Sequence, residues 1–302
     1  MAKRSSKNLG FRAPPSASAQ PFLTRIDGKR ALLPELLPLI PAFPGAYHQP
    51  FLGDAALFFE AHNHCLLQSK RIFLSDIRGE LANVYAVVRD DVDALVARLA
   101  WMGQFSDREA ACRQLSQLDT NLLCYIGSAA LFLYLSQLCT NGFRRLNHCG
   151  LSYSSFDYLE NPNFFDEDVL RADSRALQDV EISCADFRAS LQTVRSGDFV
   201  YLDSPYFGVF DKYTSRGFPL QDHEDLAVEF ERLTTLGAYV LMSNSSSDWV
   251  RERYAAFRQV QVMAPRRVNS NGKGRGPVSE LIIVGWEPAD VAAVPASAGV
   301  AS

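Results

Sequence analysis

The sequence lacks any long hydrophobic run. None of its 302 residues belong to a stretch apolar enough to span a bilayer, and no signal-peptide pattern opens the chain. We therefore expect a cytoplasmic protein without membrane contacts. No internal repeat is visible, and no complete phosphate-binding glycine loop of the Gly-x-x-x-x-Gly-Lys-Ser/Thr type is present, which argues against a nucleotide P-loop.

The sequence has little cysteine, and its spacing is not that of metal ligands. We expect reduced, buried thiols and no metal, because cytosolic proteins rarely keep disulfides. The histidines His148 and His223 also lack the neighbours of a metal site or a Ser/His/Asp site. The six cysteines are Cys65, Cys112, Cys124, Cys139, Cys149 and Cys184.

An excess of basic residues is also absent. The formal net charge is −4, so a generally basic coat for nucleic acid is excluded, although a local basic stripe can still bind phosphates. Hydrophobic residues make up 47% of the chain, enough to bury the core of one large α/β domain or of two unequal domains.

Strand and helix patterns alternate along most of the chain, which predicts a mostly parallel sheet with helices on both faces. Strands are expected at 47–51, 72–76, 199–202, 238–242, 260–263 and 280–286. Helices are expected from Asp54 to about Ala61, over 79–89 and 221–236, and from Asp248.

Three other parts of the chain differ from this pattern. Residues 91–141 have apolar side chains at helical spacing and predict a helical insertion. Residues 1–19 are expected to form a disordered basic tail, and residues from 288 onward a second flexible tail.

The run Val200-Tyr-Leu-Asp-Ser-Pro-Tyr206 is the most informative part of the chain. It ends a predicted strand, and ligands of open α/β sheets bind outside the carboxyl ends of the strands. Asp203 and Tyr206 are therefore predicted to reach a site, where a carboxylate accepts hydrogen bonds from an amine and an aromatic ring stacks on a base. Pro205 stiffens the loop because its φ is fixed.

Other segments carry weaker signals, each with a plainer alternative. Lys29 follows a glycine before a predicted helix and can hold an anion, or is a surface lysine. Asp76 ends a predicted strand and can bind a ribose, or caps a helix. The basic stretches 141–148 and 266–276 suit DNA bases or phosphates, or are solvated loops.

Taken together, these segments resemble the Dam-like (D12 class) adenine-N6 DNA methyltransferases over about residues 20–287. The Asp203-Ser-Pro-Tyr206 run differs by one residue from the Asp-Pro-Pro-Tyr signature of amino-methylating DNA methyltransferases. The order of motifs is similar to the family's α group. Seven further matches follow the family order: Arg25–Lys29, Pro50–Asp54, Ser75–Ile77, Asn141–Asn147, Asp186–Phe187, Tyr213–Phe218, and Ser243–Asn244 with the Arg267–Leu281 pattern.

The resemblance implies a Rossmann-like methyltransferase fold that uses S-adenosyl-L-methionine to methylate the N6 amine of a flipped adenine in double-stranded DNA. It implies a catalytic domain of residues 20–90 and 180–287 and a helical DNA-recognition region of residues 91–179. The sequence leaves the oligomeric state open, and a monomer is the default expectation. The implied catalytic residues are Asp203, Ser204, Pro205 and Tyr206. The implied cofactor-binding residues are Arg25, Lys29, Phe51, Gly53, Asp76, Asp186, Phe187 and Asp203, and the implied DNA-binding residues are Arg144, Arg145, Asn147, Tyr213, Asn271, Lys273 and Arg275.

Three positions depart from the family pattern. Ser204 replaces the first proline of the catalytic motif, Arg25 an aromatic residue, and Asp54 the second glycine of the cofactor loop. Two alternatives therefore stay open. One is a weakened or inactive homologue that acts as a DNA-binding module, and the other is a methyltransferase for another amine, in RNA or at cytosine N4.

Overall fold

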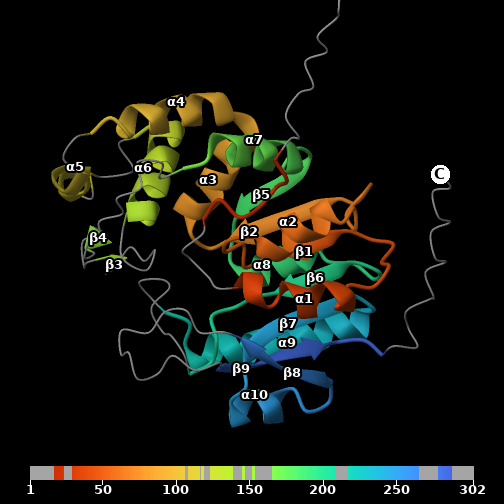
Figure 1. The fold of residues 1–302 in the computed structure, drawn as a ribbon. Helices are drawn as coiled ribbons and strands as arrows, with labels where there is room; N and C mark the ends of the chain where they lie inside the picture. Colours follow the sequence, from red (N-terminus) through yellow and green to blue (C-terminus); the bar gives the residue numbers. More distant parts are fainter. Residues whose placement is uncertain are drawn as a thin grey trace, which may run out of the picture.

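The computed structural model describes residues 17–23, 29–105, 108–115, 117–118, 123–138, 145–146, 152–153, 165–208, 217–264 and 278–287. A seven-stranded sheet crosses the molecule, with the strand order β5-β2-β1-β6-β7-β9-β8 (Figure 1). The strands are β1 (Tyr47–Gln49), β2 (Ile72–Asp76), β5 (Val180–Cys184), β6 (Phe199–Leu202), β7 (Tyr239–Ser245), β8 (Arg258–Ala264) and β9 (Val278–Val284).

The sheet is mostly parallel, as the sequence predicts. Strands β5, β2, β1, β6 and β7 pair in parallel, whereas β9 runs antiparallel to both of its neighbours, β7 and β8. The Rossmann-like methyltransferase fold is therefore confirmed.

The strands of the sheet centre are buried on both faces, which explains their continuous apolar sequences. Phe199 and Tyr201 of β6 face one hydrophobic cluster, and Val200 and Leu202 face the other. The first cluster contains side chains of α2 (Ala56–Asn63) and α3 (Gly79–Asp90), with α1 (Leu33–Leu36) and the short turns η1 (Lys29–Ala31) and η2 (Leu37–Leu39) beside them. The second contains side chains of α8 (Phe187–Ser190), α9 (Leu220–Leu236) and α10 (Asp248–Arg253), next to the turn η5 (Leu191–Thr193).

A group of helices lies between β2 and β5 in the sequence. It comprises α4 (Val92–Met102), α5 (Arg108–Leu115), α6 (Tyr125–Leu138) and α7 (Glu167–Ala176), with the two-residue strands β3 (Arg145–Leu146) and β4 (Ser152–Tyr153) paired to each other. Figure 1 shows α4, α5 and α6 gathered at one end of the molecule, beyond α3. The predicted helices within 91–141 are thus present, and their apolar side chains extend the first cluster.

Several elements were not expected from the sequence, among them α7 and β5. Helix α7 begins after Asp166, whose carboxylate accepts the N–H groups of Asp168 and Val169. Strand β5 is an edge strand with exposed or half-exposed residues after Val180, so it lacks a continuous apolar run. The strand pattern of these residues is therefore too weak to predict β5.

Three smaller expectations need correction. The described thiols of Cys65, Cys124 and Cys184 are free, as expected, but they are exposed rather than buried, because they lie in a turn, before a helix and on the edge strand. Strand β1 stops at Gln49 because Pro50 has no N–H for a further ladder bond. At the start of the chain, Ala19 is buried and its carbonyl accepts a hydrogen bond from Asn63, so this end of the predicted tail is packed.

Within the described ranges, no helix is both long and apolar enough to cross a membrane.

Candidate active site

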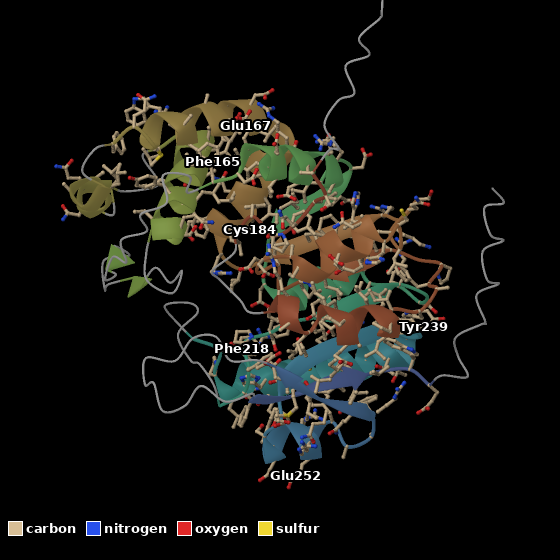
Figure 2. All side chains as sticks on the ribbon, in the orientation of Figure 1. Phe165, Glu167, Cys184, Phe218, Tyr239 and Glu252 are labelled. Atoms are coloured by element: carbon tan, nitrogen blue, oxygen red, sulfur yellow. The ribbon has the colours of Figure 1, made fainter. Side chains whose placement is uncertain are left out.

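The predicted site residues gather at the carboxyl edge of the sheet. Asp76 is the last residue of β2, Asp186 follows β5, and Asp203 follows β6. Figure 2 labels Tyr239, the first residue of β7, and Phe218, which precedes α9, at opposite ends of the strands, with Phe218 at the end that carries the site. Parallel strands bring these acids to one edge, as expected for a ligand site in an open α/β sheet.

On one half of this edge, the loop after β1 is tied to the end of β2. Gly53 has a φ of 52°, a left-handed conformation that suits glycine, and its N–H donates to Asp76 Oδ2 at 3.5 Å. The other oxygen of Asp76 accepts from the backbone N–H and Nε of Arg78, at 3.0 and 3.1 Å. Tyr85 donates its hydroxyl proton to the carbonyl of Gly53 at 3.2 Å. Gly53 and Asp76 are thus brought together.

The residue after Gly53 is a buried acid. Asp54 is 5% exposed, and its Oδ1 accepts the N–H of Ala56 at 3.0 Å, at the first turn of α2. The sequence predicts that Asp54 caps this helix, and the carboxylate does so from one residue before the N-cap, Ala55. Ala55 itself has a φ of 53°, which is strained for a residue with a side chain.

Asp186 caps the short helix α8. Its Oδ1 accepts the N–H of Arg188 at 2.9 Å, and the Arg188 guanidinium lies over the ring of Phe187, 4.4 Å from its centroid. Arg188 also binds Asp222 and Asp225 of α9, with Nη2 2.7 Å from Asp222 Oδ1. The helix after β5 is thereby fastened to α9.

Aromatic rings link the cofactor loop to the region behind the catalytic motif. Phe51 stacks on Phe187 at a centroid distance of 5.5 Å, and Phe218 contacts both rings at 6.0 and 5.9 Å. Next to Phe218, the aromatic contacts continue through His223 to Phe207 and Trp249, the last two stacked at 4.4 Å. The predicted residues Phe51 and Phe187 therefore form part of one apolar wall.

On the other half of the edge, Asp203 is held by a neighbouring strand. Ser243 of β7 donates its hydroxyl proton to Asp203 Oδ1 at 2.7 Å, and the hydroxyl of Tyr201 lies 3.1 Å from Ser243 Oγ. Beneath them, burial and the charge of Asp203 raise the pKa of the Tyr47 hydroxyl well above its usual value. Asp203 thus has a fixed oxygen at the end of β6.

Tyr206 is held by the strand on the far side of β7. Its hydroxyl donates to Glu280 Oε2 of β9 at 2.6 Å. Burial, followed by the charges of Asp203 and Glu280, raises the pKa of Tyr206 well above its usual value, so the phenol stays neutral. The next residue, Phe207, donates its N–H to Asn244 Oδ1 at 3.0 Å and accepts from the Ser245 hydroxyl at 2.8 Å.

Ser204 is the departure within the catalytic motif. The side chain is buried at 3% exposure, and in the part of the chain that the structure describes its hydroxyl oxygen has no hydrogen-bond partner. An unpaired buried hydroxyl costs stability. Pro205 follows and is half-buried.

Ser243 and Glu280 had no predicted role, although both lie in matched family segments. Their contacts depend on the strand order β6-β7-β9, which brings residues about 40 and 74 positions away to the motif. Only a prediction of that strand order, with β9 antiparallel, would have placed them at the site.

Several predicted residues lie outside what the structure describes. For Lys29 in η1 and Arg145 in β3, only the backbone is placed. The predicted residues that lie wholly outside the described ranges are Arg25, Arg144, Asn147, Tyr213, Asn271, Lys273 and Arg275. Among the described residues, no group of three or more His, Cys, Asp or Glu side chains is arranged to hold a metal ion.

Comparison with known proteins agrees with this geometry. Residues 27–268 match the D12 class N6 adenine-specific DNA methyltransferase family. The type II methyltransferase M.MjaIII of Methanocaldococcus jannaschii is 30% identical over 291 residues, covering 88% of this chain and 99% of that protein.

Two further relatives have similar coverage. The type II methyltransferase M1.LlaDCHI of Lactococcus lactis subsp. cremoris is 28% identical, over 88% of this chain and 95% of the relative. The retron Ec67 DNA adenine methylase of Escherichia coli is 29% identical, over 85% and 88% of the two chains. The chain belongs to the D12 class of N6 adenine-specific DNA methyltransferases and is an enzyme that methylates adenine in DNA.

Proposed function

We propose that the chain transfers the methyl group of S-adenosyl-L-methionine to the N6 amine of an adenine flipped out of duplex DNA, with Asp203 and Tyr206 at the reacting base. The observation that supports this most strongly is their placement. Both residues follow β6 at the carboxyl edge of the sheet, and each is fixed by a hydrogen bond from a different strand, β7 or β9.

The cofactor half of the edge fits S-adenosyl-L-methionine in its chemistry. The left-handed Gly53 allows close approach of a ligand to the backbone, and Asp76 offers a carboxylate for ribose hydroxyls. Asp186 and Phe187 would face the adenine ring, and Phe51 completes that wall. When bound, the cofactor supplies a methyl group on a positively charged sulfur. Arg25 and Lys29 are proposed to bind its carboxylate, and Asp203 to border its methionine end.

The catalytic half then positions the amine. Tyr206 would stack on the flipped adenine, while an oxygen of Asp203 and the carbonyl of Ser204 accept the two N6 hydrogens. The hydrogen bond from Ser243 to Oδ1 would hold the Asp203 carboxylate in place for this role. Two acceptors on the hydrogens direct the nitrogen lone pair toward the methyl donor, so catalysis comes from orientation and charge placement.

Neutral Tyr206 is part of this arrangement. A phenolate beside Asp203 would place two negative charges at the base, and the raised pKa of Tyr206 prevents this at physiological pH. The aromatic face then offers stacking, which is worth about 1–3 kcal/mol per base in single-strand recognition.

For DNA contact, we propose the segment 91–179 as the recognition region, with Arg144, Arg145 and Asn147 reading bases or phosphates. Tyr213, Asn271, Lys273 and Arg275 are proposed to contact the DNA from the other side. The support for the last three is topological. Strand β8 ends at Ala264 and the antiparallel β9 begins at Val278, and both of these strand ends lie at the edge of the sheet that carries Asp203. We propose that one chain carries the whole site and acts as a monomer.

The test uses the purified chain with tritiated S-adenosyl-L-methionine and a set of duplex DNAs. We expect label in N6-methyladenine, and we expect Asp203→Ala to reduce transfer at least about 100-fold while calorimetry still detects cofactor binding. Asp248→Ala, an exposed acid on α10, is the matched control and should transfer like the wild type. Label in another nucleoside, or full activity of Asp203→Ala, would contradict the proposal.

A further inference from the structure

We propose that Glu280 is a positioning residue for methyl transfer, which holds the ring of Tyr206 through its hydroxyl in the orientation that the flipped base needs. This inference rests on the proposed stacking role of Tyr206. Glu280 does not touch the base in this proposal, and its whole effect passes through the phenol.

The topology explains why an acid of the last strand can reach the motif. Strand β9 is antiparallel to β7, so its first residues lie at the carboxyl edge, and Glu280 pairs with Ser245 in the register between the two strands. From there its carboxylate extends past the end of β7 and accepts the Tyr206 hydroxyl proton at 2.6 Å. Glu280 is half-buried, which protects this hydrogen bond from competition by water.

The hydrogen bond controls the direction of the ring. Pro205 restricts the backbone before Tyr206, but the ring can still turn about its two side-chain torsions. A hydroxyl-to-carboxylate bond of this length is of the charge-assisted kind, about twice as strong as a neutral one. The phenolic oxygen lies on the axis of the second torsion, so the bond fixes the first torsion and the direction in which the ring points. The preference of the phenol O–H for the plane of the ring then orients that plane toward the acceptor.

Glu280 also connects Tyr206 to Asp203. Asp203 accepts from Ser243 of β7, and Tyr206 donates to Glu280 of β9, while β7 and β9 pair directly with each other. The Asp203 carboxylate, which accepts from the amine, and the Tyr206 ring, which stacks on the base, are therefore both held by the same pair of strands, β7 and β9. Their relative placement is set by strand register rather than by the conformation of the motif loop alone.

A double-mutant cycle tests the proposal. Glu280→Ala, Glu280→Gln and Tyr206→Phe are prepared singly, and Glu280→Ala is also combined with Tyr206→Phe. In the duplex that the wild-type chain methylates, we expect Glu280→Ala to lower kcat about 10- to 100-fold, as for loss of a hydrogen bond to a charged group. Glu280→Gln keeps an acceptor oxygen and should retain activity within about threefold. Glu252→Ala, an exposed acid on α10, is the matched control.

The decisive comparison is in the Tyr206→Phe background, where Glu280→Ala should cause no further loss. The fluorescence of 2-aminopurine at the target base reports stacking directly, and Glu280→Ala should raise it while calorimetric cofactor affinity stays unchanged. An equal loss in both backgrounds would overturn the proposal, because Glu280 would then act on substrate itself. Wild-type activity in Glu280→Ala would overturn it while the proposed function stands, whereas absence of labelling by the wild-type chain would overturn both.

Discussion

The two halves of the active site are built from different kinds of contact. On the catalytic half, side chains from different strands or strand ends bind each other, as in the pairs Ser243–Asp203 and Tyr206–Glu280. On the cofactor half, carboxylates accept backbone N–H groups of turns, as Asp76 does from Gly53 and Arg78.

This difference indicates where the chain can vary. Strand register fixes the catalytic half, so a change there alters the relative position of two groups that act on one base. The cofactor half depends on backbone conformation, which several residues can adopt at a modest cost. Ala55, at a φ of 53°, is such a case, and a left-handed alanine costs roughly 1–2 kcal/mol.

The largest effect should come from a buried acid near the cofactor half. Asp173 is fully buried, and its Oδ1 accepts the N–H of Gln20 at 2.9 Å. Its ionised form would add to the raised pKa of Tyr85, the residue that binds Gly53. Burial raises the pKa of Asp173 to about 8, although the hydrogen bond from Gln20 lowers it in part.

The sign of the resulting pH dependence follows from this raised pKa. The folded chain keeps a proton on Asp173 that the unfolded chain releases above about pH 4. The contribution of Asp173 is therefore most favourable below pH 4 and is lost as the pH rises to about 8, by at most about 1.4 kcal/mol per pH unit. Urea unfolding of the wild type and Asp173→Asn at pH 5, 6, 7 and 8 measures the slope. Identical slopes for the two proteins would show that Asp173 is charged in the fold.

The next largest effect should be a loss of cofactor affinity that leaves the catalytic half unchanged. Asp76→Ala removes the proposed ribose acceptor and frees the N–H of Gly53, so cofactor affinity should fall about 10- to 100-fold. Calorimetry with S-adenosyl-L-methionine measures this fall, and Asp93→Ala, an exposed acid on α4, serves as the control. If Asp76→Ala instead binds cofactor normally and loses only kcat, the division of the edge into two halves is wrong.

The smallest effect concerns Ser204 on the catalytic half. Ser204→Ala removes a buried hydroxyl that has no partner in the described part of the chain, so the free energy of unfolding should rise by about 1 kcal/mol. Urea unfolding checks this, with Ser196→Ala on the exposed surface as the control. A loss of stability would mean that the Ser204 hydroxyl is hydrogen-bonded after all.

Much of the sheet could be predicted because its central strands are buried on both faces and follow a simple apolar pattern. Strand β6 occupies the predicted residues, and β2 ends at the predicted Asp76. The pattern failed at the edge strand β5, where one face is exposed. The predicted burial of Cys184 was wrong for the same reason, because an edge strand leaves its side chains accessible to solvent.

The motif residues of the site were found from the sequence because the strand-end acids and the Asp203–Tyr206 run are local signals. The roles of Ser243 and Glu280 were not predicted, because their partners are distant in the chain and are brought close by the order of strands. Nothing near Glu280 in the sequence identifies Tyr206 as its neighbour, whereas the insertion of β9 between β7 and β8 does.

That insertion also has a consequence for the time at which the enzyme becomes complete. Among the described strands β9 is the last to be synthesised, yet it lies between two earlier ones, so β7 and β8 have no shared neighbour until Val278–Val284 has been made. A nascent chain that ends before Val278 contains the entire Asp203–Tyr206 motif but lacks Glu280. Until β9 has been synthesised, a nascent chain would therefore carry the motif without the hydrogen bond from Tyr206 to Glu280 that orients its ring.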